Sequence, residues 1–119
     1  MNASKLLEQI KRHPDFNQVG MVLCHNGVVR GTSRDGRKVS GLRVAVDHDK
    51  LEQIIRMKKK LPGIVEILVH INEDQDLKVG DDVMYLVVAG DVRERVLTAL
   101  SETLNVIKST VTRKTEFFV

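Results

Sequence analysis

The apolar residues of this chain recur at intervals that change from helical to strand-like along its length. The first interval is helical and predicts a short helix over residues 4–13, which Pro14 ends. Residues 20–25 are almost continuously apolar and predict a short strand, bounded by the turn-forming residues 25–27. The apolar stripe of the helix consists of Leu6, Leu7 and Ile10.

A second strand is predicted over residues 38–46, after an Asp-Gly pair at residues 35–36 that is typical of a tight turn. The apolar alternation of this strand slips by one position. The first apolar residue lies on the odd phase and the next three lie on the even phase: Val39, then Leu42, Val44 and Val46. One extra residue near Ser40 and Gly41 restores the alternation, so the pattern predicts a β-bulge there.

An amphipathic helix follows, with a cap at Asp47 or Asp49, and it ends near residue 60, before Pro62. Residues 64–71 are apolar at nearly every position, as expected of a strand covered on both faces. A polar turn separates them from residues 84–89, which predict another wholly apolar strand.

The last helix is predicted to begin at a cap on Asp91, and residues 112–119 predict a final strand. One face of this helix carries its apolar residues: Val92, Val96, Leu100, Leu104 and Ile107. From residue 38 onward the predicted order is β-α-β-β-α-β, preceded by a short helix and a strand. This order predicts an α+β fold with a ferredoxin-like pattern. No repeat or linker interrupts the 119 residues, so we expect a single domain over residues 1–119.

Composition narrows the functional classes. Cys24 is the only cysteine and lies in an apolar run, which predicts a buried thiol and a fold that needs no disulfide. The four histidines are scattered, so we expect no metal site and no cofactor. No apolar run reaches the about 20 residues that cross a bilayer, and no signal peptide is evident. We therefore expect a cytoplasmic protein that does not bind membranes.

The net charge of +3 permits an anionic ligand or an acidic protein partner, while the four aromatic residues are few for stacking nucleic-acid bases. We therefore expect no nucleic acid among the partners. Four basic residues lie at the ends of predicted elements: Arg30, Arg93, Lys108 and Lys114. Each alone is typical of a solvated surface, but together they indicate one anion-binding cleft.

Several of these residues lie in five short segments: Gly27-Val-Val-Arg30, Gly36-Arg-Lys-Val-Ser-Gly-Leu42, Val79-Gly-Asp81, Asn105-Val-Ile-Lys108 and Arg113-Lys-Thr-Glu116. In order and spacing, these segments resemble the catalytic (large) subunit of molybdopterin synthase. The resemblance extends from about Val19 to Glu116. It implies an α/β-hammerhead fold, which amends the plain ferredoxin-like pattern.

The resemblance also implies an activity and partners. An enzyme of this family acts in molybdenum cofactor biosynthesis as a homodimer. Each protomer binds a small ubiquitin-like sulfur carrier that ends in Gly-Gly, which gives a heterotetramer. Sulfur passes from the thiocarboxylate of the carrier to cyclic pyranopterin monophosphate, a pterin phosphate, and forms molybdopterin.

Site residues follow from the resemblance position by position. Lys108 matches the catalytic lysine, and Lys114 matches the lysine of a Lys-x-Glu motif, so both are expected to be catalytic. The other matched positions are expected to bind substrate: Arg30, Val92, Arg93 and Glu116.

The chain departs from the family pattern at several positions. Val92 replaces the pocket histidine, Ile71 replaces the arginine of a second His-Arg pair, and residues 42–46 lack the Tyr-Glu-Ala-Tyr character. Two alternatives therefore stay open. One is a non-catalytic descendant of this fold that acts as a dimeric binding or regulatory protein, and the other is an unrelated ferredoxin-like binding module.

Overall fold

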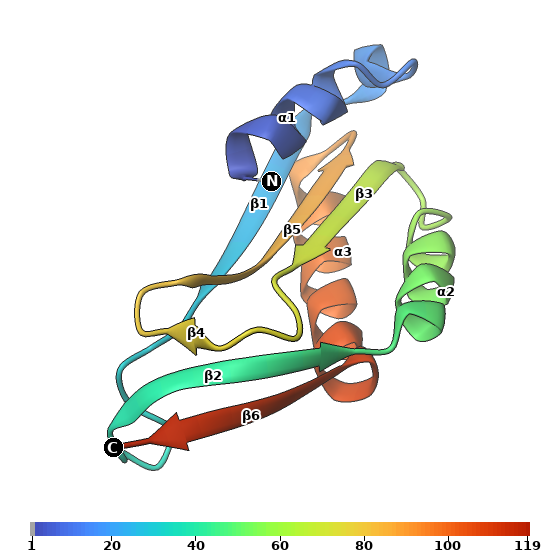
Figure 1. The fold of residues 1–119 in the computed structure, drawn as a ribbon. Coiled ribbons are helices and arrows are strands. Elements are labelled where there is room, and N and C mark those ends of the chain that lie inside the picture. The colour runs from blue at the N-terminus through green and yellow to red at the C-terminus, as the bar shows by residue number, and fades with distance from the viewer. Residues whose placement is uncertain (1) are drawn as a thin grey trace.

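The strands of the protein form two antiparallel three-stranded sheets in the computed structural model, which describes residues 2–119 (Figure 1). The first sheet contains, in spatial order, β1 (Met21–Val28), β5 (Asp82–Gly90) and β3 (Ile64–Ile71). The second contains β4 (Leu77–Lys78), β2 (Val39–Val46) and β6 (Thr112–Phe118). The helices are α1 (Ala3–Lys11), α2 (His48–Lys58) and α3 (Arg93–Val106), with a 3₁₀ turn η1 (Phe16–Gln18) and a π-helical turn η2 (Ile107–Val111).

The predicted order of elements is confirmed, and the fold is of the α+β class. The strands do not form one continuous ferredoxin-like sheet, however. A split β-α-β arrangement would place β5 between β2 and β3. Here the N-terminal strand β1 occupies that edge of β5, so β2 keeps its pairing with β6 but has the short β4 on its other side in place of β5. The two halves of the expected sheet are thus separate, and Figure 1 shows the β2–β6 pair crossing beside the end of the first sheet.

Helices cover both faces of β5, which explains why this strand is apolar at nearly every position. Its even-numbered residues pack toward α3, with Met84, Leu86 and Val88 in one cluster. Its odd-numbered residues pack toward α1, where Val87 and Ala89 join Leu6 and Ile10 of that helix in a second cluster. Because side chains alternate between the faces of a strand, burial on both sides requires a continuous apolar run.

The predicted β-bulge in β2 is confirmed. Val39 pairs with Phe118 and Gly41 pairs with Phe117, so one extra residue, Ser40, lies in β2 at this point. A Cβ atom at Gly41 would overlap the carbonyl oxygen of Leu77 on the neighbouring β4. Glycine is therefore required for the close approach of these two strands.

Two local predictions differ from the structure. The strand predicted to stop at residues 25–27 continues to Val28, because Asn26 and Gly27 pair with β5, and this pairing overrides their turn propensity. The polar segment before Gly80 contains the short strand β4.

No helix among residues 2–119 has the length and apolar character needed to span a membrane.

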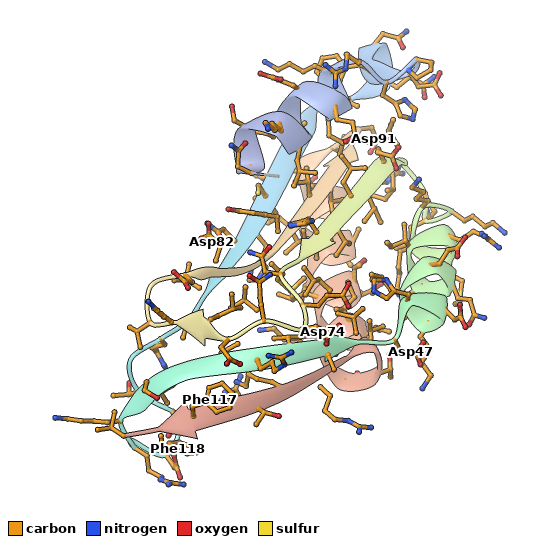
Figure 2. The ribbon with its side chains drawn as sticks, in the orientation of Figure 1. Asp47, Asp74, Asp82, Asp91, Phe117 and Phe118 are labelled. Atoms are coloured by element: carbon orange, nitrogen blue, oxygen red, sulfur yellow. The ribbon has the colours of Figure 1, made fainter. Side chains whose placement is uncertain are left out.

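The caps of the helices are partly as predicted. Asp47 caps α2, with its carboxylate accepting a hydrogen bond from the Lys50 amide at 3.1 Å (Figure 2). Asp91 is not the N-cap residue of α3, because Val92 holds that position and is 46% exposed. The carboxylate of Asp91 instead accepts hydrogen bonds from the Val92 amide and from Arg95. The buried face of α3 therefore begins at Val96, not at Val92.

Candidate functional site

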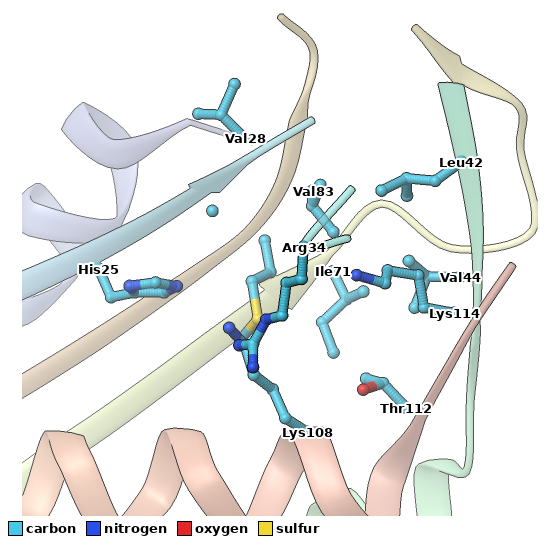
Figure 3. Close-up of a pocket in the computed structure, with 12 residues that line it drawn as sticks. His25, Val28, Arg34, Leu42, Val44, Ile71, Val83, Lys108, Thr112 and Lys114 are labelled. Carbon is cyan, nitrogen blue, oxygen red and sulfur yellow. The ribbon is translucent and has the colours of Figure 1, made fainter. Parts of the chain in front are cut away.

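A pocket of about 330 Å³ lies where the two sheets meet the C-terminal end of α3 (Figure 3). Both sheets contribute to its wall, together with η2 and the loop between β1 and β2. The lining residues are His25, Gly27, Val28, Arg34, Leu42, Val44, Ile71, Val83, Met84, Lys108, Thr112 and Lys114.

The charged residues of this pocket are all cations. Arg34, Lys108 and Lys114 line it, and within the part of the chain from residue 2 onward no Asp or Glu does. In the same part of the chain, none of the three forms a salt bridge. A concave surface whose charged groups are all positive favours an anionic ligand. The planar guanidinium of arginine suits phosphate or carboxylate.

Lys108 reaches the pocket from the π-helical turn η2. The flanking residues Ile107 and Val111 are buried, which anchors the turn against the core and leaves Lys108 exposed. The hydroxyls of Ser109 and Thr110 donate hydrogen bonds to the carbonyl oxygens of Asn105 and Val106 and so satisfy the end of the helix. Single π-helical turns of this kind are frequent at functional sites.

Lys114 reaches the pocket from β6. It pairs with Val44 of β2, whose side chain is buried in a small apolar cluster and also lines the pocket. Glu116 lies two residues further along the same strand, opposite Leu42, and is half-buried. Glu116 therefore shares a strand face with Lys114 but does not line the pocket.

Arg34 lies in a tight turn of the loop between β1 and β2. The amide of Gly36 donates a hydrogen bond to the Ser33 carbonyl oxygen at 3.0 Å, and Gly36 has a φ of 87°. That φ lies in the left-handed region that glycine adopts without strain, so the Asp-Gly turn expected from the sequence is confirmed. The turn directs Arg34 toward Lys108 and Lys114 (Figure 3).

His25 of β1 also lines the pocket. Its Nε2 atom is buried and has no hydrogen-bond partner among residues 2–119. Burial lowers the pKa of this imidazole below 6.5, and the nearby ammonium of Lys108 lowers it further. The ring is therefore neutral at pH 7, in a pocket whose other titratable side chains are cations.

Sequence reasoning missed His25 and Arg34. The predicted first strand ended at residue 25, so no strand phase was assigned to His25. Strand alternation continued from Met21 and Leu23, which pack toward α3, would have placed His25 on the same face. Arg34 had no signal beyond its position beside the Asp-Gly pair, because a loop residue has no periodicity.

Other predicted site residues lie outside the pocket wall. The Nε atom of Arg30 donates a hydrogen bond to the Thr32 carbonyl oxygen at 2.8 Å. Arg93 lies in the first turn of α3, and its side chain is 74% exposed. Its Nη2 atom is 3.7 Å from Oε1 of Glu94. Val92 precedes it at the same end of the helix. The structure thus brings Lys108 and Lys114 together with Arg34 and His25, and places Val92 and Arg93 at the opposite end of α3.

No metal site is apparent in the described chain: residues 2–119 contain no group of three His, Cys, Asp or Glu side chains placed to hold an ion.

Comparison with known proteins identifies relatives of this fold. The family model described as MoaE protein matches residues 1–110. No curated protein matches the sequence. Among solved structures, molybdopterin synthase from Staphylococcus aureus superposes with a TM-score of 0.80 at 21% identity, over 100% of this chain and 86% of that one.

Two further structures are similar. The molybdopterin cofactor biosynthesis protein E of Burkholderia multivorans has a TM-score of 0.77 at 18% identity, over 100% of this chain and 84% of that one. A complex of subunits 1 and 2 of the molybdopterin-converting factor from Helicobacter pylori gives 0.72 at 16% identity, again over 100% and 84%. At these identities the structures establish the fold.

Proposed function

Because the chain belongs to the MoaE protein family and so to molybdenum cofactor biosynthesis, we propose that it is the catalytic subunit of a molybdopterin synthase. In this proposal it transfers sulfur from the thiocarboxylate of a small carrier protein to cyclic pyranopterin monophosphate. The observation that carries the proposal is the pocket with three cations and no lining carboxylate among residues 2–119. Both proposed ligands, a thiocarboxylate tail and a cyclic phosphate, are anionic.

The cations of the pocket have distinct proposed roles. Lys108 and Lys114 are the proposed catalytic residues, since an ammonium group can stabilise the charge that develops on an oxygen or sulfur during transfer. Arg34 is the proposed phosphate ligand, because its guanidinium can donate two parallel hydrogen bonds. Glu116 shares a strand face with Lys114, and we propose that it orients that lysine or the substrate.

The proposed partner is a small ubiquitin-like carrier that ends in Gly-Gly. The similar Helicobacter pylori structure is a complex of two subunits, which supports a binary assembly of this kind. A tail of two glycines is narrow enough to lie in an apolar groove. The apolar wall of the pocket, with Leu42, Val44 and Ile71, supports this arrangement.

We also propose a homodimer in which the C-terminal end of β6 is covered. Phe117 and Phe118 are 37% and 39% exposed, and Val119 is 87% exposed. Figure 2 shows Phe117 and Phe118 at the C-terminal end of β6. An exposed apolar end on an edge strand favours association. Deleting residues 117–119 should convert dimer to monomer or aggregate, and light scattering that finds an unchanged dimer mass would contradict this role.

Turnover separates the enzyme from a non-catalytic descendant. Purified protein, thiocarboxylated carrier and cyclic pyranopterin monophosphate should yield molybdopterin, detected by mass spectrometry. The Lys108→Ala variant should be slower by about 100-fold or more, as expected when a charge-stabilising group is lost. Carrier binding without product in the wild-type protein would favour the alternative of a dimeric binding protein, which the replacement at Val92 supports.

A further inference from the structure

The His25 side chain is half-buried, and its Nε2 atom is shielded from solvent. Its Nε2 atom makes no hydrogen bond within residues 2–119, although buried ring nitrogens usually do. The ring belongs to the wall of the pocket, so a molecule bound there can supply the missing partner. The unsatisfied nitrogen is therefore a candidate contact for a molecule bound in the pocket.

Among residues 2–119, every charged residue that lines the pocket together with this ring is a cation. Lys108 approaches from η2, Arg34 from the β1–β2 loop and Lys114 from β6 (Figure 3). The neighbours on β5 are apolar: Leu86 pairs directly with His25, and Met84 lies further along the strand. Among residues 2–119 no carboxylate lines the pocket to stabilise a protonated ring, which favours the neutral imidazole.

Gly27 lies beside this nitrogen on the pocket wall. A Cβ atom at Gly27 would lie 3.4 Å from His25 Nε2, an ordinary van der Waals distance, and the glycine places no side chain there. The segment of β1 beside the ring is therefore free of bulky side chains at this position.

The proposed sulfur transfer creates a need for a base. When a thiocarboxylate sulfur bonds to a carbon of the substrate, the oxygen that it replaces leaves with the electron pair of the broken C–O bond. The acyl group of the carrier remains attached to the sulfur as a thioester. Water must then form a bond to the acyl carbon, and the acyl–sulfur bond must break. The products are a carrier carboxylate and a substrate thiolate, and two protons are released. A neutral imidazole is suited to accept the first proton, because one of its ring nitrogens carries a free lone pair.

We infer that His25 is the general base of this hydrolysis, an inference that rests on the proposed function. Its Nε2 takes a proton from water as the oxygen attacks the acyl carbon. The ammonium of Lys108 stabilises the oxyanion of the tetrahedral intermediate, and the sulfur leaves with the electron pair of the broken bond. The imidazolium then releases its proton to solvent. His25 thereby supplies a histidine to the pocket from β1, while Val92 lies at the far end of α3.

The test compares His25→Gln with His70→Gln in single-turnover reactions of the full chain with thiocarboxylated carrier and cyclic pyranopterin monophosphate. His70 is a matched control, because it lies in β3 and does not line the pocket. Its Nε2 atom is hydrogen-bonded to Oδ1 of Asn72 at 3.1 Å. His25→Gln should slow hydrolysis of the carrier–pterin thioester by about 100-fold or more, the usual contribution of a general base. The carrier–pterin thioester should accumulate in intact-mass spectra, and His70→Gln should stay within about twofold of wild type.

The pH profile gives a readout that a structural role would not change. The wild-type rate should fall at acid pH as His25 becomes protonated, and His25→Gln should lose this acid limb. If His25→Gln does not fold, Lys108→Gln provides the second measurement: removal of the ammonium should move the acid limb to higher pH, since Lys108 lowers the pKa of His25.

The outcomes separate the inference from the proposed function. Wild-type turnover with an equally active His25→Gln variant would overturn the role of His25 and leave the sulfur transfer standing. A slow His25→Gln variant that accumulates no thioester and keeps the acid limb would also overturn it. A wild-type protein that makes no product with a carrier it binds would overturn both.

Discussion

His25 and Lys108 are electrostatically coupled across the pocket, although they lie on β1 and on η2. Burial lowers the pKa of the His25 imidazole below 6.5, and the charge of Lys108 lowers it further. The pKa of this histidine is lower in the folded state than in the unfolded state. At pH values between these two pKa values, the folded protein therefore binds fewer protons than the unfolded chain. Stability therefore rises with pH in this window and falls as the pH drops below 6.5.

This coupling predicts a pH-dependent free energy of unfolding. Urea denaturation of the wild-type protein at pH 7 and pH 5 should show a loss at pH 5 that is smaller in Lys108→Gln. His25→Phe should lose this contribution altogether, because phenylalanine does not titrate. An identical difference between the two pH values in all three proteins would contradict the coupling.

Arg34 and Arg30 form a matched pair for testing the anion site. Only Arg34 lines the pocket, whereas Arg30 bonds to the carbonyl oxygen of Thr32. Arg34→Lys keeps the net charge but loses the bidentate fork, so the affinity for cyclic pyranopterin monophosphate should fall about tenfold. Arg30→Lys should cause a smaller loss. Calorimetry that finds the larger loss at Arg30 would reassign the phosphate ligand.

Arg93 can contribute to the Lys108 pocket only from a second protomer. Arg93 begins α3 and Lys108 lies in η2 just beyond its other end, and the 14 residues of the helix span roughly 20 Å. If both serve one site, the inactive variants Lys108→Ala and Arg93→Ala should regain part of the activity when mixed, because one pocket of each mixed dimer is intact. No recovery after subunit exchange, verified by mass spectrometry, would reject the shared site.

Gly41 and Gly31 test the contact between β2 and β4. A Cβ at Gly41 would overlap the Leu77 carbonyl oxygen, whereas one at Gly31 would meet only a Val79 methyl group at 3.7 Å, an ordinary contact. Gly41→Ala should therefore lower the free energy of unfolding by about 2 kcal/mol or more, and Gly31→Ala by under about 0.5 kcal/mol. Equal stabilities of the two variants in denaturant titrations would show that β4 moves away at little cost.

The sequence predicts those features of this protein that depend on local periodicity. The run at residues 64–71 matches β3 at both ends, and the phase slip at Ser40 locates the bulge in β2. Pairing between distant strands is not encoded in periodicity, so the separation of β2 from β5 could not be predicted. The site was affected in the same way. His25 could not be predicted as a pocket residue, because β1 continues past it through pairing with β5 and not through local propensity.

The separation of the two sheets has a mechanical consequence. No ladder of backbone hydrogen bonds joins β1-β5-β3 to β4-β2-β6, so the sheets are held together by side-chain packing and by the connecting chain. Lys114 belongs to one of these bodies and His25 to the other. A ligand that contacts both residues would brace the two sheets against each other. Amide hydrogen exchange should then slow in β1 and β6 together when the pocket is filled, and slowing confined to one sheet would argue against such bracing.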